Sequence, residues 1–376
     1  MKRLGLFIAT LLLVTTALYF EPVVFPPKLE TSTQDQQLMG NQNQVTSWKY
    51  QELSATGFST YIGQPVTKLE SAIGSPKDRL TSGFGFEIRY YQDPINQIVL
   101  EANIQNDQVE AIKVLNANAT SLAPFSVGMT MQDLTEITTI FPNFTFEYED
   151  TEVGIELTEE DMNYRPLIAF DNGTFAMLFF DQDTGGLFST VYLNKKSLLK
   201  LIPYQVFGEG LPQYQVDESA DWESINQSRE RVVTRLLTRL RHEAELPDYY
   251  HSPEFMIQTD VLLTDFLNQP EEWLADNRLA EWEMASQTAQ TTVRFTLSND
   301  EINRLVEKRQ LDQTTGIFMH PIIDPTFSFL LLYTDPYYHD RFLDKEPTQL
   351  GVAFSKENML VLMQEKEETS ESSDNQ

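Results

Sequence analysis

The chain has 376 residues, enough for two or three domains that each bury a core of their own. It carries 27 Lys and Arg against 56 Asp and Glu, so its net charge of −29 repels nucleic acid and anionic lipid. There is no cysteine, which excludes disulfides, thiolate metal sites and a cysteine nucleophile. We therefore expect no nucleic-acid partner and no membrane contact by the bulk of the chain.

The N-terminus has the character of a membrane segment. Lys2 and Arg3 precede an apolar run that extends from Leu4 to Phe20. Basic residues remain in the cytoplasm, so we predict that residues 1–28 are an uncleaved signal anchor and that the C-terminal bulk lies outside the cell membrane, in single-pass topology. The alternatives are a cleaved signal, which gives a secreted protein, and a buried soluble helix. Residues 29–50 are polar and are predicted to form a disordered spacer.

A short pattern occurs twice in the first half of the chain. In each copy a glycine turn, at Gly63 and at Gly128, precedes a short amphipathic helix, a proline segment and strand-like residues. Duplication implies two copies of one supersecondary unit that share a core. We predict a module over 51–212 with repeats at about 58–119 and 124–205.

Two hairpins are expected in this module. Asn106 and Asp107 lie between alternating apolar runs and favour a tight turn. A second hairpin passes through the acidic turn from Asp181 to Gly186. Asp and Gly satisfy turn geometry, whereas the alternative of a calcium site lacks a ligand set with calcium-loop spacing.

Helical periodicity replaces strand alternation after a linker predicted from Pro203 to Asp221. The first helix, from Ser224, has an apolar stripe and an arginine-rich surface. These arginines allow two interpretations, contact with an anionic wall polymer or pairing with the protein's own carboxylates, and the second is preferred. The cluster consists of Arg229, Arg231, Arg235, Arg239 and Arg241.

A second helix is predicted from Ser252, because serine is a good N-cap and Pro253 suits the first helical position. Its apolar face consists of Phe255, Thr259, Leu262, Leu263 and Phe266. A helix at Asn299–Glu307 and closing strands at Leu350–Val352 and Met359–Met363 follow, and the acidic tail, 365–376, is predicted to be disordered.

One run of the second repeat is specific enough to identify a family. It consists of Arg165-Pro166-Leu167-Ile168, Phe175-Ala176, Leu178-Phe179-Phe180-Asp181, Thr184, Leu187, Leu198-Leu199 and Pro203-Tyr204. This run resembles the CAP-associated N-terminal region, a module of exported proteins of Gram-positive bacteria. The segments Gly63 to Pro76 and Gly83 to Phe86 resemble its first repeat, so the likeness extends from about Tyr61 to Tyr204.

The remainder of the chain is similar to the domain that normally follows this module. Asp335 to Leu343 resembles the family's helix segment that ends in serine-x-x-histidine-arginine, and Leu350 to Ala353 resembles the strand after it. The resemblance implies a CAP domain, also called SCP-like, at 222–364. It implies an α+β chain overall, with the membrane helix, the tandem-repeat module and an α-β-α sandwich in that order.

The resemblance also implies a ligand set that this chain lacks. Many CAP domains carry two histidines and two acidic residues around a cleft, in some cases with a divalent metal. His339 matches the last histidine, whereas Ile317 stands where the family's glutamate belongs and Phe318 follows it. We therefore expect a degenerate domain in which His339 is a remnant with a structural role, with no catalytic residues, no metal and no cofactor.

The other features of the sequence leave two functional hypotheses. No H-E-x-x-H, G-x-S-x-G, P-loop or dinucleotide motif occurs, and Trp273 and Trp282 are interpreted as core aromatics rather than sugar-stacking residues. The first hypothesis is a non-enzymatic binding or interaction protein at the cell envelope, whose partner is a wall polymer or another envelope protein. The second is an envelope hydrolase with a non-standard catalytic set. Convergence of several candidate ligands would favour the enzyme, namely His251, His320, His339, Glu301 and Asp324.

Overall fold

The computed structural model describes residues 50–117, 119–201, 204–343, 345 and 348–365. The predicted signal anchor, most of the predicted spacer and nearly all of the predicted tail lie outside these residues. Within them, no helix has the length and apolar character that a membrane span requires. The described residues all belong to the compact unit Lys49–Gln376.

A mixed sheet of eight strands forms the N-terminal module, the part of the chain from β1 to β11. Its strand order is β1-β8-β9-β10-β5-β4-β3-β2, antiparallel except for the parallel pair β1 and β8. The strands are β1 (Glu52–Leu53), β2 (Asp78–Thr81), β3 (Glu87–Asp93), β4 (Ile98–Gln105), β5 (Gln108–Asn116), β8 (Leu167–Phe170), β9 (Phe175–Phe180) and β10 (Leu187–Leu193). The two predicted repeats meet at the pairing of β5 with β10.

The predicted sharing of one core by the two repeats is confirmed. Short helices cover one face of the sheet, namely η1 (Gly57–Tyr61), α3 (Val66–Ile73), α4 (Ala119–Leu122) and α5 (Met131–Ile137). Leu69 of α3 and Leu134 of α5 are fully buried in the same hydrophobic cluster. Gly63 and Gly128 precede α3 and α5 with φ of 73° and 82°, a left-handed conformation that glycine adopts without steric cost.

Both predicted hairpins are also confirmed. Asn106 and Asp107 both have positive φ between β4 and β5, as a tight turn that matches the strand twist requires. The second hairpin joins β9 and β10 through the turn at Asp181. Alternation along β5 sends Ile112 and Val114 to the helix-covered face, and Ala111 and Leu115 to the opposite one.

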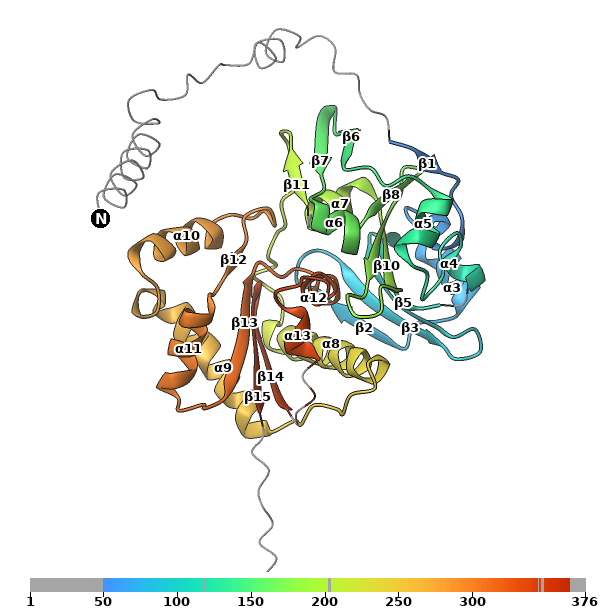
Figure 1. Cartoon of the computed structure of the whole chain (residues 1–376). Helices are drawn as coiled ribbons and strands as arrows, with labels where there is room; N and C mark the ends of the chain where they lie inside the picture. Colours follow the sequence, from blue (N-terminus) through green and yellow to red (C-terminus); the bar gives the residue numbers. More distant parts are fainter. Residues whose placement is uncertain (1–49, 118, 202–203, 344, 346–347, 366–376) are drawn as a thin grey trace, which may run out of the picture. The chain divides into compact units, whose positions relative to one another are not determined.

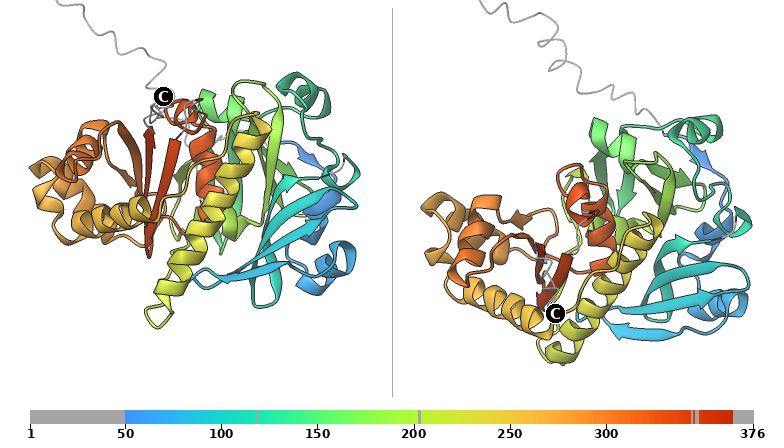
Figure 2. Two further views of the ribbon diagram at one scale, coloured as in Figure 1. Left: turned by 90° about the horizontal axis from the view of Figure 1, so that it is seen from below. Right: turned by 60° about the horizontal axis from the view of Figure 1, so that its bottom comes forward.

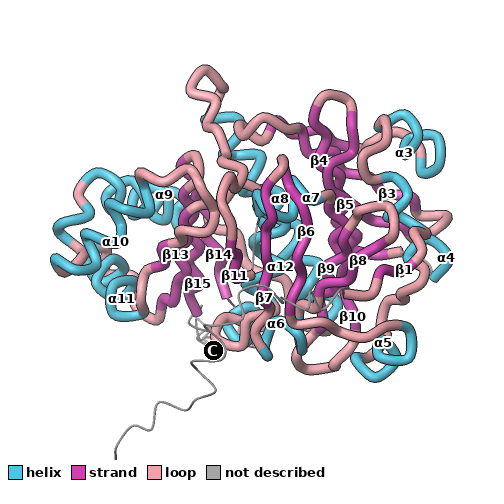
Figure 3. The backbone as a smooth tube through the Cα atoms, turned by 90° about the horizontal axis from the view of Figure 1, so that it is seen from above, coloured by secondary structure: helices cyan, strands magenta, loops and turns pink. Residues whose placement is uncertain are grey.

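The predicted linker from Pro203 begins with a strand. β11 (Gln205–Phe207) pairs with β7 (Thr151–Glu156), which pairs with β6 (Asn143–Tyr148), so these three form a separate sheet (Figure 3). Two helices, α6 (Glu159–Tyr164) and α7 (Lys195–Leu201), complete the module. A three-residue strand is too short to show alternation, and backbone pairing alone defines it.

Tyr50, placed in the predicted spacer, instead packs on Phe144 with ring centroids 4.9 Å apart.

The C-terminal domain, the part of the chain from α8 to β15, has a four-stranded antiparallel sheet in the order β12-β13-β15-β14. The strands are β12 (Phe295–Thr296), β13 (Thr314–His320), β14 (Thr348–Ser355) and β15 (Asn358–Glu365). The helices are α8 (Trp222–Glu243), α9 (Pro253–Asn268), η2 (Pro270–Glu272), α10 (Asp276–Ser286), α11 (Asn299–Lys308), α12 (Pro325–Tyr333) and α13 (His339–Phe342). Glu365, assigned to the tail from sequence, therefore ends a strand.

Helices lie on both faces of this second sheet (Figure 1). One face packs against α9, α10 and α11, through residues such as Phe318 and Leu362. The other face packs against α8 and α12, through residues such as Val352 and Val361. The predicted α+β class is confirmed, and the predicted cap of α9 is present, because the Ser252 hydroxyl accepts from the Phe255 N–H at 3.3 Å.

One hydrophobic cluster joins the module to the C-terminal domain. It contains Val191 of β10, Val233 of α8 and Phe327 of α12, all of them buried. The helices α8 and α12 thus cover part of the face of the eight-stranded sheet that the short helices leave open, beside β6, β7 and α7 of the module (Figure 2). Because two sheets share these helices, residues far apart in sequence meet at the boundary between the two parts.

Candidate functional site

His339 lies at the boundary between the module and the C-terminal domain, at the first residue of α13. Its side chain is 3% exposed, and its ring packs on the Tyr333 ring with centroids 4.7 Å apart. Its Nδ1 lies 2.7 Å from the Tyr333 carbonyl oxygen, so Nδ1 donates its proton there. Its Nε2 makes no hydrogen bond within the described residues and faces Asp183 Oδ2 at 3.5 Å.

The acidic turn of the module reaches this histidine from the other side. Asp181 Oδ1 accepts from the Thr184 N–H and hydroxyl, both at 2.8 Å, which fixes the turn. Asp181 Oδ2 accepts from the Tyr333 hydroxyl at 3.0 Å, which fixes the turn against α12. The interpretation of this segment as a turn is therefore confirmed, with an added role as a contact between the two parts.

A cavity of about 370 Å³ opens between the turn, the end of α8 and Tyr333. We call it the Tyr333 cavity. It combines four carboxylates with aromatic and aliphatic side chains. Its walls are formed by Asp181, Asp183, Thr184, Phe188, Leu240, Glu243, Ala244, Glu245, Tyr333 and Leu343.

The carboxylates shape the electrostatics of the cavity. Burial raises the pKa of Tyr333, and the neighbouring carboxylates of Asp181, Glu243 and Asp183 raise it further. The pKa of Glu243 is also raised, by partial desolvation and by Asp181, although Arg239 at 2.7 Å opposes this shift. The cavity thus has a negative potential and disfavours additional negative charge.

Comparison with known proteins agrees with this architecture. The family model described as CAP-associated N-terminal matches residues 62–204. Residues 62–204 are a CAP-associated N-terminal module. The part that follows has the fold of SCP domains, as the structural neighbours below indicate.

Two solved structures share the fold along most of the chain. An extracellular protein containing an SCP domain from Bacillus anthracis aligns with a TM-score of 0.62 at 16% identity, over 85% of this chain and 98% of that one. A cysteine-rich secretory protein from Staphylococcus aureus aligns with a TM-score of 0.61 at 15% identity, over 84% of this chain and 98% of that one. The CAP-associated module and the CAP-like domain therefore occur here in the expected order.

A curated relative is also similar in sequence. The uncharacterized membrane protein YlbC of Bacillus subtilis is 21% identical over 234 residues, which is 61% of this chain and 66% of that protein. The match thus spans slightly less than two thirds of the relative's length.

The position at which this CAP-like domain departs from the CAP glutamate pattern belongs to the hydrophobic core. Ile317, at that position, and Phe318, which follows it, are each 1% exposed on β13. Ile317 packs toward α8 and α12, whereas Phe318 packs on Phe266 with ring centroids 4.8 Å apart. These side chains fill space between sheet and helices.

The other candidate ligands named from sequence do not converge. His320 contacts the Asn358 side chain at 2.9 Å and the Ala285 carbonyl at 3.2 Å, and Glu301 binds Arg278 at 3.0 Å. Across the part of the chain that the structure describes, no three His, Asp or Glu side chains group as metal ligands. His251 is exposed.

Asp324 belongs to a buried ion cluster between the CAP-associated module and the CAP-like domain. Lys113 Nζ lies 2.7 Å from Asp324 and 3.2 Å from Glu101, and neither Lys113 nor Asp324 is exposed. Asn103 donates to Asp324 at 2.7 Å, and Thr326 donates to Glu101 at 2.6 Å. We call these five residues the buried ion cluster. The sequence pattern around Lys113 did not indicate this role.

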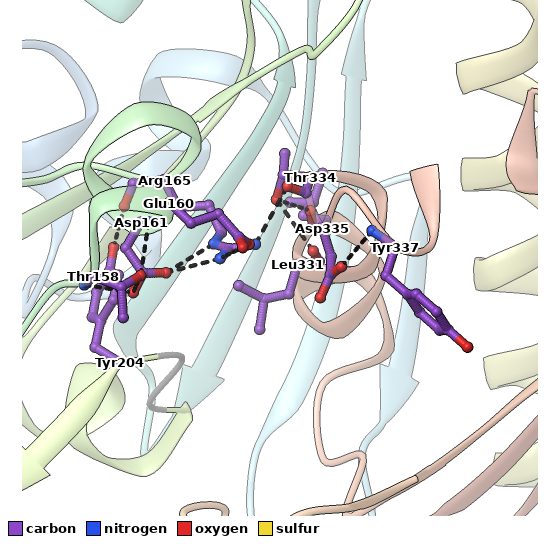
Figure 4. Close-up of polar contacts among 10 residues, drawn as sticks. Thr158, Glu160, Asp161, Arg165, Tyr204, Leu331, Thr334, Asp335 and Tyr337 are labelled. Carbon is purple, nitrogen blue, oxygen red and sulfur yellow. Dashed lines mark hydrogen bonds and ion pairs between the residues drawn. The ribbon is translucent and has the colours of Figure 1, made fainter. Parts of the chain in front are cut away.

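A second polar contact between the two parts centres on Arg165, from the family-specific run (Figure 4). Its guanidinium binds Asp161 at 2.9 Å and Glu160 at 2.8 Å, and donates to the Thr334 carbonyl at 3.4 Å. Tyr204 donates to the Arg165 carbonyl at 2.5 Å. Residues that define the module in sequence thus also anchor it to the end of α12.

The arginines of α8 serve the protein's own structure. Arg229 and Arg241 are 1% exposed, and Arg229 donates to the Ile322 carbonyl at 2.5 Å while Arg241 donates to the Phe342 carbonyl at 3.2 Å. Arg235 pairs with Glu101 at 3.3 Å and Arg239 with Glu243. The interpretation as pairing with the protein's own carboxylates is confirmed for Arg235 and Arg239.

Trp273 and Trp282 are buried, as interpreted from sequence.

Proposed function

We propose that this chain is a non-enzymatic binding protein of the cell envelope, anchored by residues 1–28 with the described fold outside the membrane. The basic residues before the apolar run support this topology. The description of YlbC as a membrane protein and of the two structural neighbours as extracellular and secretory proteins supports the same location.

The surroundings of His339 support binding rather than catalysis. This residue, the match to the family's last histidine, is held by the Tyr333 carbonyl on one nitrogen and faces Asp183 with the other. Its side chain is 3% exposed, so a substrate has little access to the ring. A catalytic acid or base has to reach the proton it transfers. We therefore assign His339 a structural role and assign ligand contact to the Tyr333 cavity.

The ligand we propose is part of a cell-wall polymer or of another envelope protein. The cavity has the size of a small-ligand site, about 300 Å³ or more, and combines apolar walls with a few polar groups. It is negative, as is the whole chain, so an anionic ligand is disfavoured. We propose that this binding requires no cofactor.

Co-sedimentation with isolated bacterial cell walls tests this function. The purified full-length protein is incubated with walls, and both bound protein and soluble wall fragments are measured over time. We expect saturable binding without release of fragments. Time-dependent release that requires the folded protein would replace the proposal with the hydrolase hypothesis.

A further inference from the structure

The edge strand β14 of the C-terminal sheet has backbone groups that are free to pair. It ends the order β12-β13-β15-β14, so it has a neighbouring strand on one side only. On its open side the Leu350 N–H donates to the Tyr250 carbonyl at 3.0 Å. Because backbone groups alternate along an antiparallel strand, Val352 and Phe354 also direct their N–H and C=O groups to that side. The Phe354 N–H faces the Glu230 carboxylate, whereas Val352 makes no backbone hydrogen bond there among the described residues.

A groove of about 460 Å³ opens at this edge. Val352 and Phe354 lie at its base, and its two walls are formed by α8 and α9, which lie on either side of β14 (Figure 2). These helices belong to the two opposite layers that cover the sheet. A strand added in the groove therefore extends the sheet and lies between the same two layers of helices. We call this feature the β14 groove.

The two walls of the β14 groove differ in chemistry. The wall from α9 is largely apolar, because Met256 and Ile257 are 36% and 65% exposed there. Successive side chains of an extended strand point to opposite faces of its sheet, so a strand in the groove directs alternate side chains to the two walls. The wall from α8 is polar and acidic, and consists of Glu223, Asn226, Gln227 and Glu230.

The charges of the groove select the occupant. Asp260 of the α9 wall is close enough to raise the pKa of Glu230, so a cation placed between them is favoured by both. Neither carboxylate forms a salt bridge within the part of the chain that the structure describes. The chain's own acidic C-terminal tail and a second copy of this chain, at a net charge of −29, are disfavoured by the same charges.

We propose that the β14 groove binds an extended segment of another envelope protein in which basic and apolar residues alternate, and that this segment joins the sheet as a strand beside β14. Its backbone pairs with Val352, its basic side chains face α8, and its apolar side chains face Met256 and Ile257. Backbone bonds of this kind supply affinity, and the alternate side chains supply specificity. The inference rests on the proposed binding function and adds a surface separate from the Tyr333 cavity.

Fluorescence anisotropy of labelled peptides with the purified full-length protein tests the alternation. The probe is a six-residue peptide in which lysine and valine alternate, and the matched control has three lysines followed by three valines. Both have the same charge, so general attraction to an acidic protein affects them equally. We expect saturable binding of the alternating peptide and at least about tenfold weaker binding of the block peptide. Equal affinities, or no binding of the alternating peptide, would overturn the proposal.

Two matched variants locate the binding site. Ile257→Lys places a cation on the apolar wall, and Ile95→Lys makes the same change between β3 and β4, outside the groove. Both isoleucines are exposed, at 65% and 89%, so neither change is expected to disturb folding. We expect Ile257→Lys to weaken binding of the alternating peptide at least about fivefold, and Ile95→Lys to leave it near the wild-type value. Equal losses in the two variants would show that net charge alone attracts the peptide, against the proposal.

The Val352→Pro variant tests the backbone bond. Proline removes the N–H on the open side without removing a bond to β15, and edge strands accept proline at such positions. We expect binding of the alternating peptide to be lost while urea denaturation still shows a folded protein, and retained binding would contradict the proposed strand.

Hydrogen exchange of the wild-type protein tests the same bond without a substitution. The alternating peptide should slow exchange of the Val352 amide, and unchanged exchange at saturating peptide would overturn the proposal. Wall binding by a protein that ignores the alternating peptide would also overturn it and would leave the proposed envelope function intact.

Discussion

Two of the polar contacts between the CAP-associated module and the CAP-like domain are of opposite character. In the buried ion cluster, Lys113 and Asp324 are fully enclosed and their partners come from both sides. At the Tyr333 cavity, carboxylates outnumber cations and Asp183 is exposed. Since an enclosed charge must be balanced whereas an exposed one need not be, the first contact fixes the two parts and the second remains available to a ligand.

Removal of the central cation should have the largest effect. Lys113→Met leaves Asp324 buried without its cation and Glu101 with Arg235 alone, so we expect a loss of about 3–5 kcal/mol in the free energy of unfolding. Urea denaturation measures it. Adding Glu101→Gln and Asp324→Asn to Lys113→Met should restore part of the loss. A change below about 1 kcal/mol in Lys113→Met would mean that the cluster is solvated.

A carboxylate on α8 outside both contacts should dominate the pH dependence. Burial, and then the charge of Asp260, raises the pKa of Glu230 from 4.5 to about 7. A hydrogen bond from the Phe354 N–H and the charge of Arg231 lower this pKa, but by less. The folded protein therefore holds the proton more tightly, and this stabilisation is present at low pH and is lost as the pH rises from about 4.5 to about 7.

Glu230→Gln should remove this dependence and make the protein more stable than wild type by about 1 kcal/mol at about pH 8, measured by urea denaturation across pH. Glu223→Gln, an exposed change on the same helix, is the control. Parallel pH profiles for wild type and Glu230→Gln would contradict the raised pKa.

Loss of the hydroxyl that joins the turn to α12 should cost less. Tyr333→Phe keeps the ring and removes the hydrogen bond to Asp181, so we expect about 1 kcal/mol of destabilisation, because Thr184 still holds the turn. Tyr337→Phe, at an exposed tyrosine, serves as control. A loss as large as that of Lys113→Met would mean that the cavity also fixes the two parts.

Neutralising the exposed carboxylate should have the smallest effect on folding. Asp183→Asn is expected to change the free energy of unfolding by less than about 0.5 kcal/mol, because the side chain is 69% exposed. A destabilisation above about 1 kcal/mol would place Asp183 with the structural contacts rather than with the ligand site.

Local features were predictable from sequence because they depend on neighbouring residues. The cap at Ser252, the buried stripe of α9 and the Asn106 turn follow from spacing and residue type. The buried arginine Arg229 also had a local signal, since it lies four residues after Ile225 and three before Val232 on the apolar stripe of α8. Counting it with the exposed arginines concealed that signal.

Contacts between distant residues were not predictable in this way. Lys113 follows the predicted Asn106 turn in a partly alternating run, but Asp324 lies 211 residues away and only the tertiary fold brings them together. Likewise, His339 was identified from its motif, whereas its neighbours Asp183 and Tyr333 come from a turn and a helix whose packing the sequence does not specify.

The shared helices α8 and α12 have a consequence for the order of folding. The CAP-associated module is synthesised first, yet the face of its sheet around Val191 is covered by helices that follow it in the chain. Because α12 begins at Pro325, the part of this apolar face that α12 covers remains open until most of the chain has been synthesised. The growing protein is therefore most exposed to aggregation and proteolysis during its own synthesis, before the second half is complete.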